Sequence, residues 1–232
     1  PISQDRKIIK HHLYGINSVK KKFSTGEWLN LTIKKINEQW ANKKTPIVVG
    51  GTGLYFKALT DGLVKIPNIP IKTRNQVRKL HKKIGQKKFF IRLSKLDPLA
   101  KKSISPYDKQ RAMRAYEVKK FTNKSLFEFR KETKSNFKHS VFKKIFIDIP
   151  RELLRKKIEK RVEKMFEEGA IDEVKKFSKI KVNKDLSSNK IIGINEIQDY
   201  LKGKTTLKRA SELINQKTRQ YAKRQFTWAR GH

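Results

Sequence analysis

The pattern of apolar and polar positions is most informative between residues 46 and 63. A short β-branched run at 47–49 predicts a strand buried on both faces, as in a parallel sheet. Two glycines, 50–51, interrupt the run, and a mostly apolar helical segment follows them. Thr52 stands where that helix needs an N-cap. The pattern therefore predicts a strand, a glycine turn and a helix N-terminus with one hydroxyl group at the junction.

Helical spacing dominates the flanking regions. Ser24 and Glu27 fit a capping box ahead of an apolar stripe that continues to Trp40. From about residue 71 to residue 138 the pattern predicts several short helices and no strand. The N-caps expected in that region are Asp97, which precedes a proline, Asp108 and Ser125.

The last third of the chain is predicted to begin with a second strand. Alternating apolar and polar residues at 142–149 indicate a return to the sheet. Apolar residues then follow helical spacing over 153–166, and Gly169 separates this helix from a second one over 171–177. A long helix is expected over 207–228.

Length and composition narrow the class of protein. The 232 residues are enough for one large domain, or for a domain with an insertion, and no apolar run approaches the length of a membrane span. The chain has no cysteine, which excludes disulfides, thiolate catalysis and cysteine-ligated zinc. A cytoplasmic protein is expected.

The charge is strongly unbalanced. There are 58 basic and 21 acidic residues, for a formal net charge of +37. Such an excess favours a polyanionic partner such as nucleic acid. Most of the basic residues are lysines, however, and a chain rich in Lys, Asn and Ile also fits the background of an AT-rich genome. The arginine positions are therefore the better guide to binding.

The junction at Thr52 is a candidate ligand site. In an open α/β sheet, ligands bind at the carboxyl edge of the strands, and the free amides of a helix N-terminus favour anions. The alternative is a tight turn followed by a capped helix. No complete phosphate-binding loop motif occurs, because Gln198 occupies the position of the glycine required before Gly203-Lys204-Thr205.

Three segments resemble the tRNA dimethylallyltransferases, enzymes that prenylate an adenosine beside the anticodon. Residues 49–63 are similar to that family's VGGT-x-LY-x-KAL-x-x-GL, residues 110–114 to its Q-R-x-x-R, and residues 218–228 to its T-R-x-[YL]-A-K-R-Q-x-T-W. The resemblance implies an α/β fold, with a P-loop-kinase-like parallel sheet core and a helical insertion domain. It places the core at 1–70 and 141–232 and the tRNA-binding insertion at 71–140.

The resemblance also implies roles for individual residues. Thr52 is expected to contact the diphosphate leaving group and the target base, unless it serves only as an N-cap. Arg74 follows Gly62 at the spacing of a family arginine that contacts tRNA. The Q-R-x-x-R segment is also assigned to tRNA binding, although its arginines could instead form an exposed basic face paired with Glu117. Its residues are Gln110, Arg111, Ala112, Met113 and Arg114.

A further segment departs from the family pattern R-x-x-G-Y-[RK]-[EQ]. Lys190 occupies the position of the pattern's arginine, and Gly193 matches its glycine. The resemblance assigns both residues to tRNA binding. Ile194 replaces the tyrosine, and the tRNA-binding candidate Asn195 replaces a basic residue. A neutral amide cannot supply that charge, so either Lys190 or another cation substitutes or the site is weaker.

The 218–228 segment supplies the expected diphosphate contacts. Arg219 and Lys223 are four residues apart on one helix face, and Arg224 is adjacent. The aromatic residues of the segment are expected to pack inward: Tyr221, Phe226 and Trp228. The alternative is a core-packed basic helix without a ligand.

The implied reaction transfers a dimethylallyl group from dimethylallyl diphosphate to the exocyclic amine of the adenosine 3′ of the anticodon. It requires Mg²⁺ with the diphosphate, a base for the amine proton and a pocket for an extruded nucleobase. The family's phosphate loop and aspartate base would precede Pro1, so little activity is expected from these 232 residues alone.

A monomer with no membrane association is expected to bind the tRNA anticodon stem-loop. Two other interpretations stay open, a nucleotide kinase related to the P-loop enzymes and a non-catalytic basic RNA-binding module.

Overall fold

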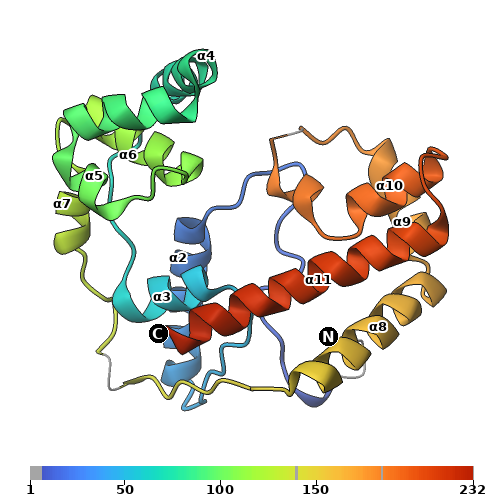
Figure 1. The fold of residues 1–232 in the computed structure, drawn as a ribbon. Coiled ribbons are helices and arrows are strands. Elements are labelled where there is room, and N and C mark those ends of the chain that lie inside the picture. Colours follow the sequence, from blue (N-terminus) through green and yellow to red (C-terminus); the bar gives the residue numbers. More distant parts are fainter. Residues whose placement is uncertain (1–6, 139–140, 184, 232) are drawn as a thin grey trace. The chain divides into compact units, whose positions relative to one another are not determined.

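The computed structural model describes residues 7–138, 141–183 and 185–231, and Figure 1 shows the helices that these ranges form. The α-helices are α2 (Thr25–Ala41), α3 (Gly53–Asp61), α4 (Ile71–Leu96), α5 (Pro98–Ser103), α6 (Lys109–Thr122), α7 (Leu126–Lys131), α8 (Arg151–Glu167), α9 (Ala170–Lys179), α10 (Ile194–Leu201) and α11 (Leu207–Arg230). A 3₁₀ turn, η2, spans Ser187–Lys190.

The chain divides into two compact units. One contains the residues up to Phe56 together with those from Phe142 onward, and the other spans Lys57–Val141. The boundary predicted between residues 140 and 141 adjoins residues 139–140, which lie outside the described ranges.

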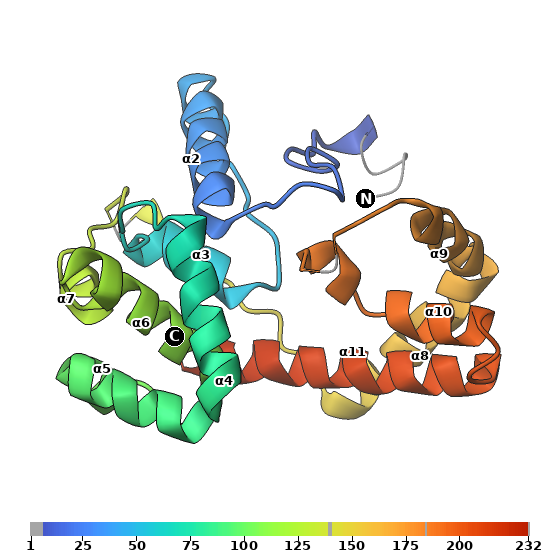
Figure 2. The same ribbon diagram turned by 90° about the horizontal axis from the view of Figure 1, so that it is seen from above.

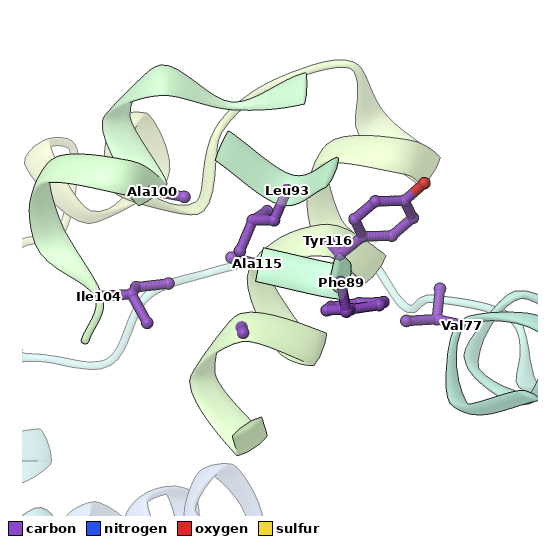
Figure 3. Packing of buried hydrophobic residues seen from close by; sticks show 8 residues of the cluster. Val77, Phe89, Leu93, Ala100, Ile104, Ala115 and Tyr116 are labelled. Atoms are coloured by element: carbon purple, nitrogen blue, oxygen red, sulfur yellow. The ribbon is translucent and has the colours of Figure 1, made fainter. Parts of the chain in front are cut away.

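The Lys57–Val141 unit has its own hydrophobic core. α4 packs against α5 and α6, and Figure 3 shows the buried side chains of these helices meeting one another. The cluster contains Val77, Phe89, Leu93, Ala100, Ile104, Ala112, Ala115 and Tyr116. These residues come from α4, α6 and the α5 region including its C-cap Ile104, so segments up to about 40 residues apart in sequence build this core.

Asp97 joins three helices of this unit, as its predicted capping role suggests. Its buried carboxylate accepts hydrogen bonds from the N–H groups of Leu99, at 3.2 Å, and Ala100, at 3.3 Å. The Ser125 hydroxyl donates to the same carboxylate at 2.8 Å. Ser125 is the N-cap of α7 and forms a capping box with Glu128. The predicted caps Asp97 and Ser125 are therefore confirmed, and they are linked to each other.

α4 is interrupted at Gly85, which the sequence pattern did not predict. Gly85 has φ 74° and ψ 168°, so the span consists of two helical stretches that meet at a sharp bend, visible in Figure 2. An isolated glycine within a helical pattern is the signal that could have identified this bend.

The unit that contains the residues up to Phe56 and those from Phe142 onward is built around α11. This helix packs against α8 and α10, and α9 packs against both α8 and α10 (Figures 1 and 2). This unit's hydrophobic cluster contains the buried residues Ile158, Val162, Ala170, Val174, Ile194, Ile197 and Ile214. The predicted break at Gly169 separates α8 from α9, and the predicted capping box of Ser24 and Glu27 begins α2.

The two predicted strands are corrected by the structure. Residues 47–49 and 142–149 form neither strand nor helix, and the described residues contain no sheet. Several apolar side chains of these segments are exposed, with 83% for Ile47, 81% for Val49 and 78% for both Ile145 and Ile147. A β-branched run becomes a strand only when a neighbouring segment completes its hydrogen bonds. Within the described residues neither run has such a partner, so the expected parallel sheet core is not found there.

Candidate active site

The glycine turn before α3 lies against the C-terminal part of α11. A Cβ atom at Gly51 would overlap the side-chain amide of Gln225, and one at Gly53 would overlap the indole of Trp228. The rigid indole makes glycine the residue required at Gly53, whereas at Gly51 the flexible Gln225 side chain could move aside. Thr52 lies between them, exposed, and its carbonyl accepts the first helical hydrogen bond from Tyr55 N–H at 2.9 Å.

An aromatic stack orients the first turn of α3. The rings of Trp28, from α2, and Tyr55 are stacked with their centroids 4.2 Å apart and an angle of 15° between planes. Trp28 belongs to the first turn of the helix that Ser24 caps. The hydroxyl of Thr52 is thus placed at a helix N-terminus that two other helices position. This agrees with the predicted start of the helix at Thr52.

A groove of about 600 Å³ lies between α8 and α11. Its lining includes Arg219 and Lys223, the two residues that the sequence pattern placed on one face of the long helix. Arg151 and Arg155, from the first turns of α8, also line it. Its apolar lining consists of Ile149, Pro150, Leu154, Ile158, Ala222 and Phe226. The groove therefore combines an apolar lining with four cations.

Two of these cations are held by glutamates. Arg219 bonds Glu159 of α8 at 3.4 Å, and Arg155 bonds Glu152 at 3.2 Å. Among the described residues, Arg151 and Lys223 have no ion-pair partner within 4.0 Å. Asp148 is the carboxylate in the lining. Two of the four cations are therefore available to an anionic ligand without breaking an existing pair.

Arg224 does not line this groove, although the sequence pattern grouped it with Arg219 and Lys223. Its guanidinium lies 5.6 Å from the ring centroid of Tyr221. Tyr221 is 40% exposed, so the prediction that it packs inward is wrong. Phe226 does pack on a neighbour, with its ring 5.9 Å from that of Phe146. The difference arises because Tyr221 and Phe226 lie on different sides of α11.

Gly193 has a structural role at the start of α10. It is buried with φ 105°, a conformation that favours glycine, and its N–H donates to the Glu196 carboxylate at 2.8 Å. Lys217 of α11 donates to the same carboxylate. Burial raises the pKa of Glu196, but hydrogen bonds from Lys217 and from the backbone N–H groups of Glu196 and Gly193 outweigh it and lower the pKa below 4.5.

Lys190 and Asn195 line a second pocket, of about 470 Å³. The Asn195 side-chain amide donates to the carbonyl of Asn189 at 3.3 Å. Lys190 is exposed at the end of η2. Two of the three residues that the sequence grouped here thus reach one pocket, while Gly193 shapes the turn beside it.

The Q-R-x-x-R segment lies in α6, in the other unit. Gln110 and Arg111 are exposed, and Arg111 pairs with the N-cap Asp108 at 3.0 Å. Arg114 is half-buried and pairs with Glu117 at 3.4 Å, as the alternative interpretation anticipated. Ala112 is fully buried in the core and Met113 packs against that core. The side chains available to a ligand are therefore those of Gln110, Arg111 and Arg114.

Arg74 lies in the first turn of α4. It is half-buried, and its Nε atom is buried with no hydrogen-bond partner in the part of the chain that the structure describes. Buried polar atoms usually have a hydrogen-bond partner, and the Arg74 Nε–H group is an exception among the described residues.

Comparisons with known proteins agree on one family. A model of the IPP transferase family matches residues 1–232. The tRNA dimethylallyltransferase of Pelagibacter ubique is 56% identical over 230 residues, which cover 99% of this chain and 74% of that protein. The corresponding Rickettsia bellii enzyme is 43% identical over 221 residues, or 95% of this chain and 70% of that protein.

Solved structures give the same answer. The tRNA isopentenylpyrophosphate transferase of Bacillus halodurans is similar with a TM-score of 0.66 and 30% identity, over 100% of this chain and 72% of that one. A eukaryotic dimethylallyltransferase captured acting on tRNA has a TM-score of 0.78 and 26% identity, over 98% of this chain and 57% of that one.

Proposed function

The chain belongs to the IPP transferase family and modifies tRNA by dimethylallyl transfer, and we propose that its groove between α8 and α11 binds the dimethylallyl donor. The observation that supports this is that Arg219 and Lys223 line the same groove as a set of apolar side chains. A dimethylallyl diphosphate molecule has the matching parts, an anionic head and a small apolar tail. Arginine and lysine suit the phosphate oxygens, and arginine can bind two of them at once.

Thr52 is proposed to act where the donor and the acceptor meet. The reaction forms a bond between the amine nitrogen and the first prenyl carbon, breaks the carbon–oxygen bond, and releases diphosphate and one proton. Negative charge develops on the departing oxygen, so hydrogen-bond donors there stabilise the transition state. The exposed hydroxyl of Thr52 and the free amides of the α3 N-terminus are such donors. We propose that the acceptor is the exocyclic amine of the adenosine 3′ of the anticodon.

Residues 71–140 are proposed to act as the tRNA-binding insertion domain. The exposed Gln110 can contact base edges or phosphates. Arg111 and Arg114 can do so once RNA replaces their carboxylate partners, Asp108 and Glu117. Arg74, in the same unit, is proposed to contact RNA through the solvent-accessible part of its half-buried side chain. Lys190 and Asn195 are proposed to contact RNA from the other unit.

Mg²⁺ is proposed as the companion ion of the diphosphate. This ion is commonly held by substrate phosphates together with one or two carboxylates. In the described ranges there is no group of three His, Cys, Asp or Glu side chains that could hold a metal by itself. We also propose that the protein is a monomer in the cytoplasm. Among the described helices, no candidate for a membrane-spanning segment is found.

A transfer assay with matched variants tests this proposal. The full-length protein that contains this sequence would be incubated with dimethylallyl diphosphate, Mg²⁺ and an anticodon stem-loop, and the nucleosides would be analysed by mass. We expect a prenylated adenosine, and we expect Arg219→Met to lower kcat/KM by about tenfold or more through the loss of a charge-assisted hydrogen bond. Arg209→Met is the control, because Arg209 lies on the same helix but outside the groove and pairs with Glu212.

Two outcomes would contradict the proposal. If Arg209→Met and Arg219→Met reduce activity equally, the groove is not the donor site. If no nucleoside product forms while RNA still binds, and binding is unaffected by Thr52→Ala, the non-catalytic RNA-binding module is favoured instead.

A further inference from the structure

The α8 wall of the groove carries two arginines to which neither the sequence motifs nor the comparisons assign a role. Arg151 is the first residue of α8 and Arg155 is one turn later, so both side chains lie on one face of the helix. Both line the groove, and Leu154 and Ile158 line it beside them. This places two cations of α8 at the same groove as Arg219 and Lys223 of α11.

The ion pairs of the groove arginines are of a kind that a phosphate can replace. Glu159 of α8 bonds Arg219 of α11 at 3.4 Å, with 49% and 39% of the side chains exposed. Arg155 and Glu152 form a similarly exposed pair. Exposed pairs of this kind contribute little to stability, whereas arginine binds phosphate through strong charge-assisted bonds.

We infer that Arg151 and Arg155 form the α8 half of a phosphate clamp, and that Glu159 holds Arg219 in place until a phosphate replaces it. The inference rests on the proposed donor site, because the phosphate is then the diphosphate of the dimethylallyl donor. Four cations on two walls can surround the two phosphates of one diphosphate. The apolar lining of the same groove favours the donor over an RNA backbone phosphate, which has no small apolar tail to place there.

The test measures the KM for dimethylallyl diphosphate in the full-length protein. Arg151→Met and Arg155→Met should each raise this KM about tenfold, because each removes a charge-assisted hydrogen bond to phosphate. They should leave the KM for the RNA within about twofold, a change close to that of a neutral substitution. Lys157→Met removes one positive charge from an exposed position on α8 that does not line the groove, so it is the matched control.

Two further measurements separate binding from folding. Inorganic pyrophosphate, titrated calorimetrically, should bind more weakly to both arginine variants, and Arg155→Lys should restore part of the affinity. Glu159→Gln should tighten pyrophosphate binding, because Arg219 then has no carboxylate partner to leave. A purely structural role for these residues would not reverse sign between the arginine and the glutamate variants.

The possible failures can be told apart. An unchanged donor KM and unchanged pyrophosphate affinity in both arginine variants would overturn the inference while leaving the proposed donor site intact. A raised RNA KM with an unchanged donor KM would assign the arginines to RNA phosphates, which also overturns it. If the wild-type protein made no product, the proposed donor site would fail, and pyrophosphate titration would still test the clamp.

Discussion

Removing the Glu196 carboxylate should loosen the junction between α10 and α11. This side chain is 4% exposed, and it accepts hydrogen bonds from Gly193 N–H at the start of α10 and from Lys217 of α11. Glu196→Ala deletes both acceptors at once. Glu196→Gln keeps an oxygen for the Gly193 N–H but removes the charge that Lys217 faces.

The two variants should differ in cost. Leaving the buried Gly193 N–H without an acceptor lowers the free energy of unfolding by about 1–3 kcal/mol. Lys217 is 49% exposed and can turn toward water. The loss of its ion pair with Glu196 therefore lowers the free energy of unfolding by a further 1 kcal/mol, roughly, or less. We therefore expect Glu196→Ala to lower the free energy of unfolding by about 2–3 kcal/mol. Glu196→Gln should lower it by about 1 kcal/mol, since only the charge is lost.

Urea unfolding followed by circular dichroism measures both values. Acidity provides an independent check, because the folded-state pKa of Glu196 lies below its ordinary value of 4.5. The ionised carboxylate thus stabilises the fold above about pH 4.5, and this contribution disappears as pH falls through the lowered pKa. The gap between wild type and Glu196→Gln should narrow below pH 4.5. A gap that is independent of pH, or Glu196→Ala within about 0.5 kcal/mol of wild type, would refute the reasoning.

Two other predictions concern local geometry. Gly53→Ala should destabilise the α3–α11 contact by about 1–3 kcal/mol, because its Cβ overlaps the Trp228 indole, whereas at Gly50 an added Cβ meets only van der Waals neighbours. Thermal melting of both alanine variants measures this, and equal melting temperatures would contradict the close approach. Asp97→Ala should cost about 2 kcal/mol by removing the α5 cap and the Ser125 hydrogen bond, as urea unfolding would show. An unchanged unfolding midpoint would contradict that linkage.

The helix boundaries were largely predictable from the sequence because their causes are local. Ser24, Asp97, Asp108 and Ser125 each cap the helix that the pattern placed after them. A capping side chain bonds amides only two or three residues away, so the chemistry is contained in a short window. Gly85 is the exception, because its effect depends on the backbone conformation it adopts.

The strands were mispredicted because a strand is not a local structure. Residues 47–49 and 142–149 have the composition of strands but lack a hydrogen-bonding neighbour within the described residues. The prediction for Tyr221 failed for a related reason. Its outward position depends on which side of α11 the other helices cover, and helical spacing alone leaves that choice open.

For the candidate site, the sequence by itself determined where the proposed residues lie along their helices. Thr52 at its helix N-terminus, and Arg219 with Lys223 on one face of α11, follow from spacing within single helices. Only the tertiary structure decided what stands opposite them. Arg151 and Arg155 are remote in sequence, and they reach the groove because the apolar stripes of α8 and α11 pack together. Spacing along a helix is set by its 3.6-residue period, whereas a clamp across two helices is set by the packing of their buried faces.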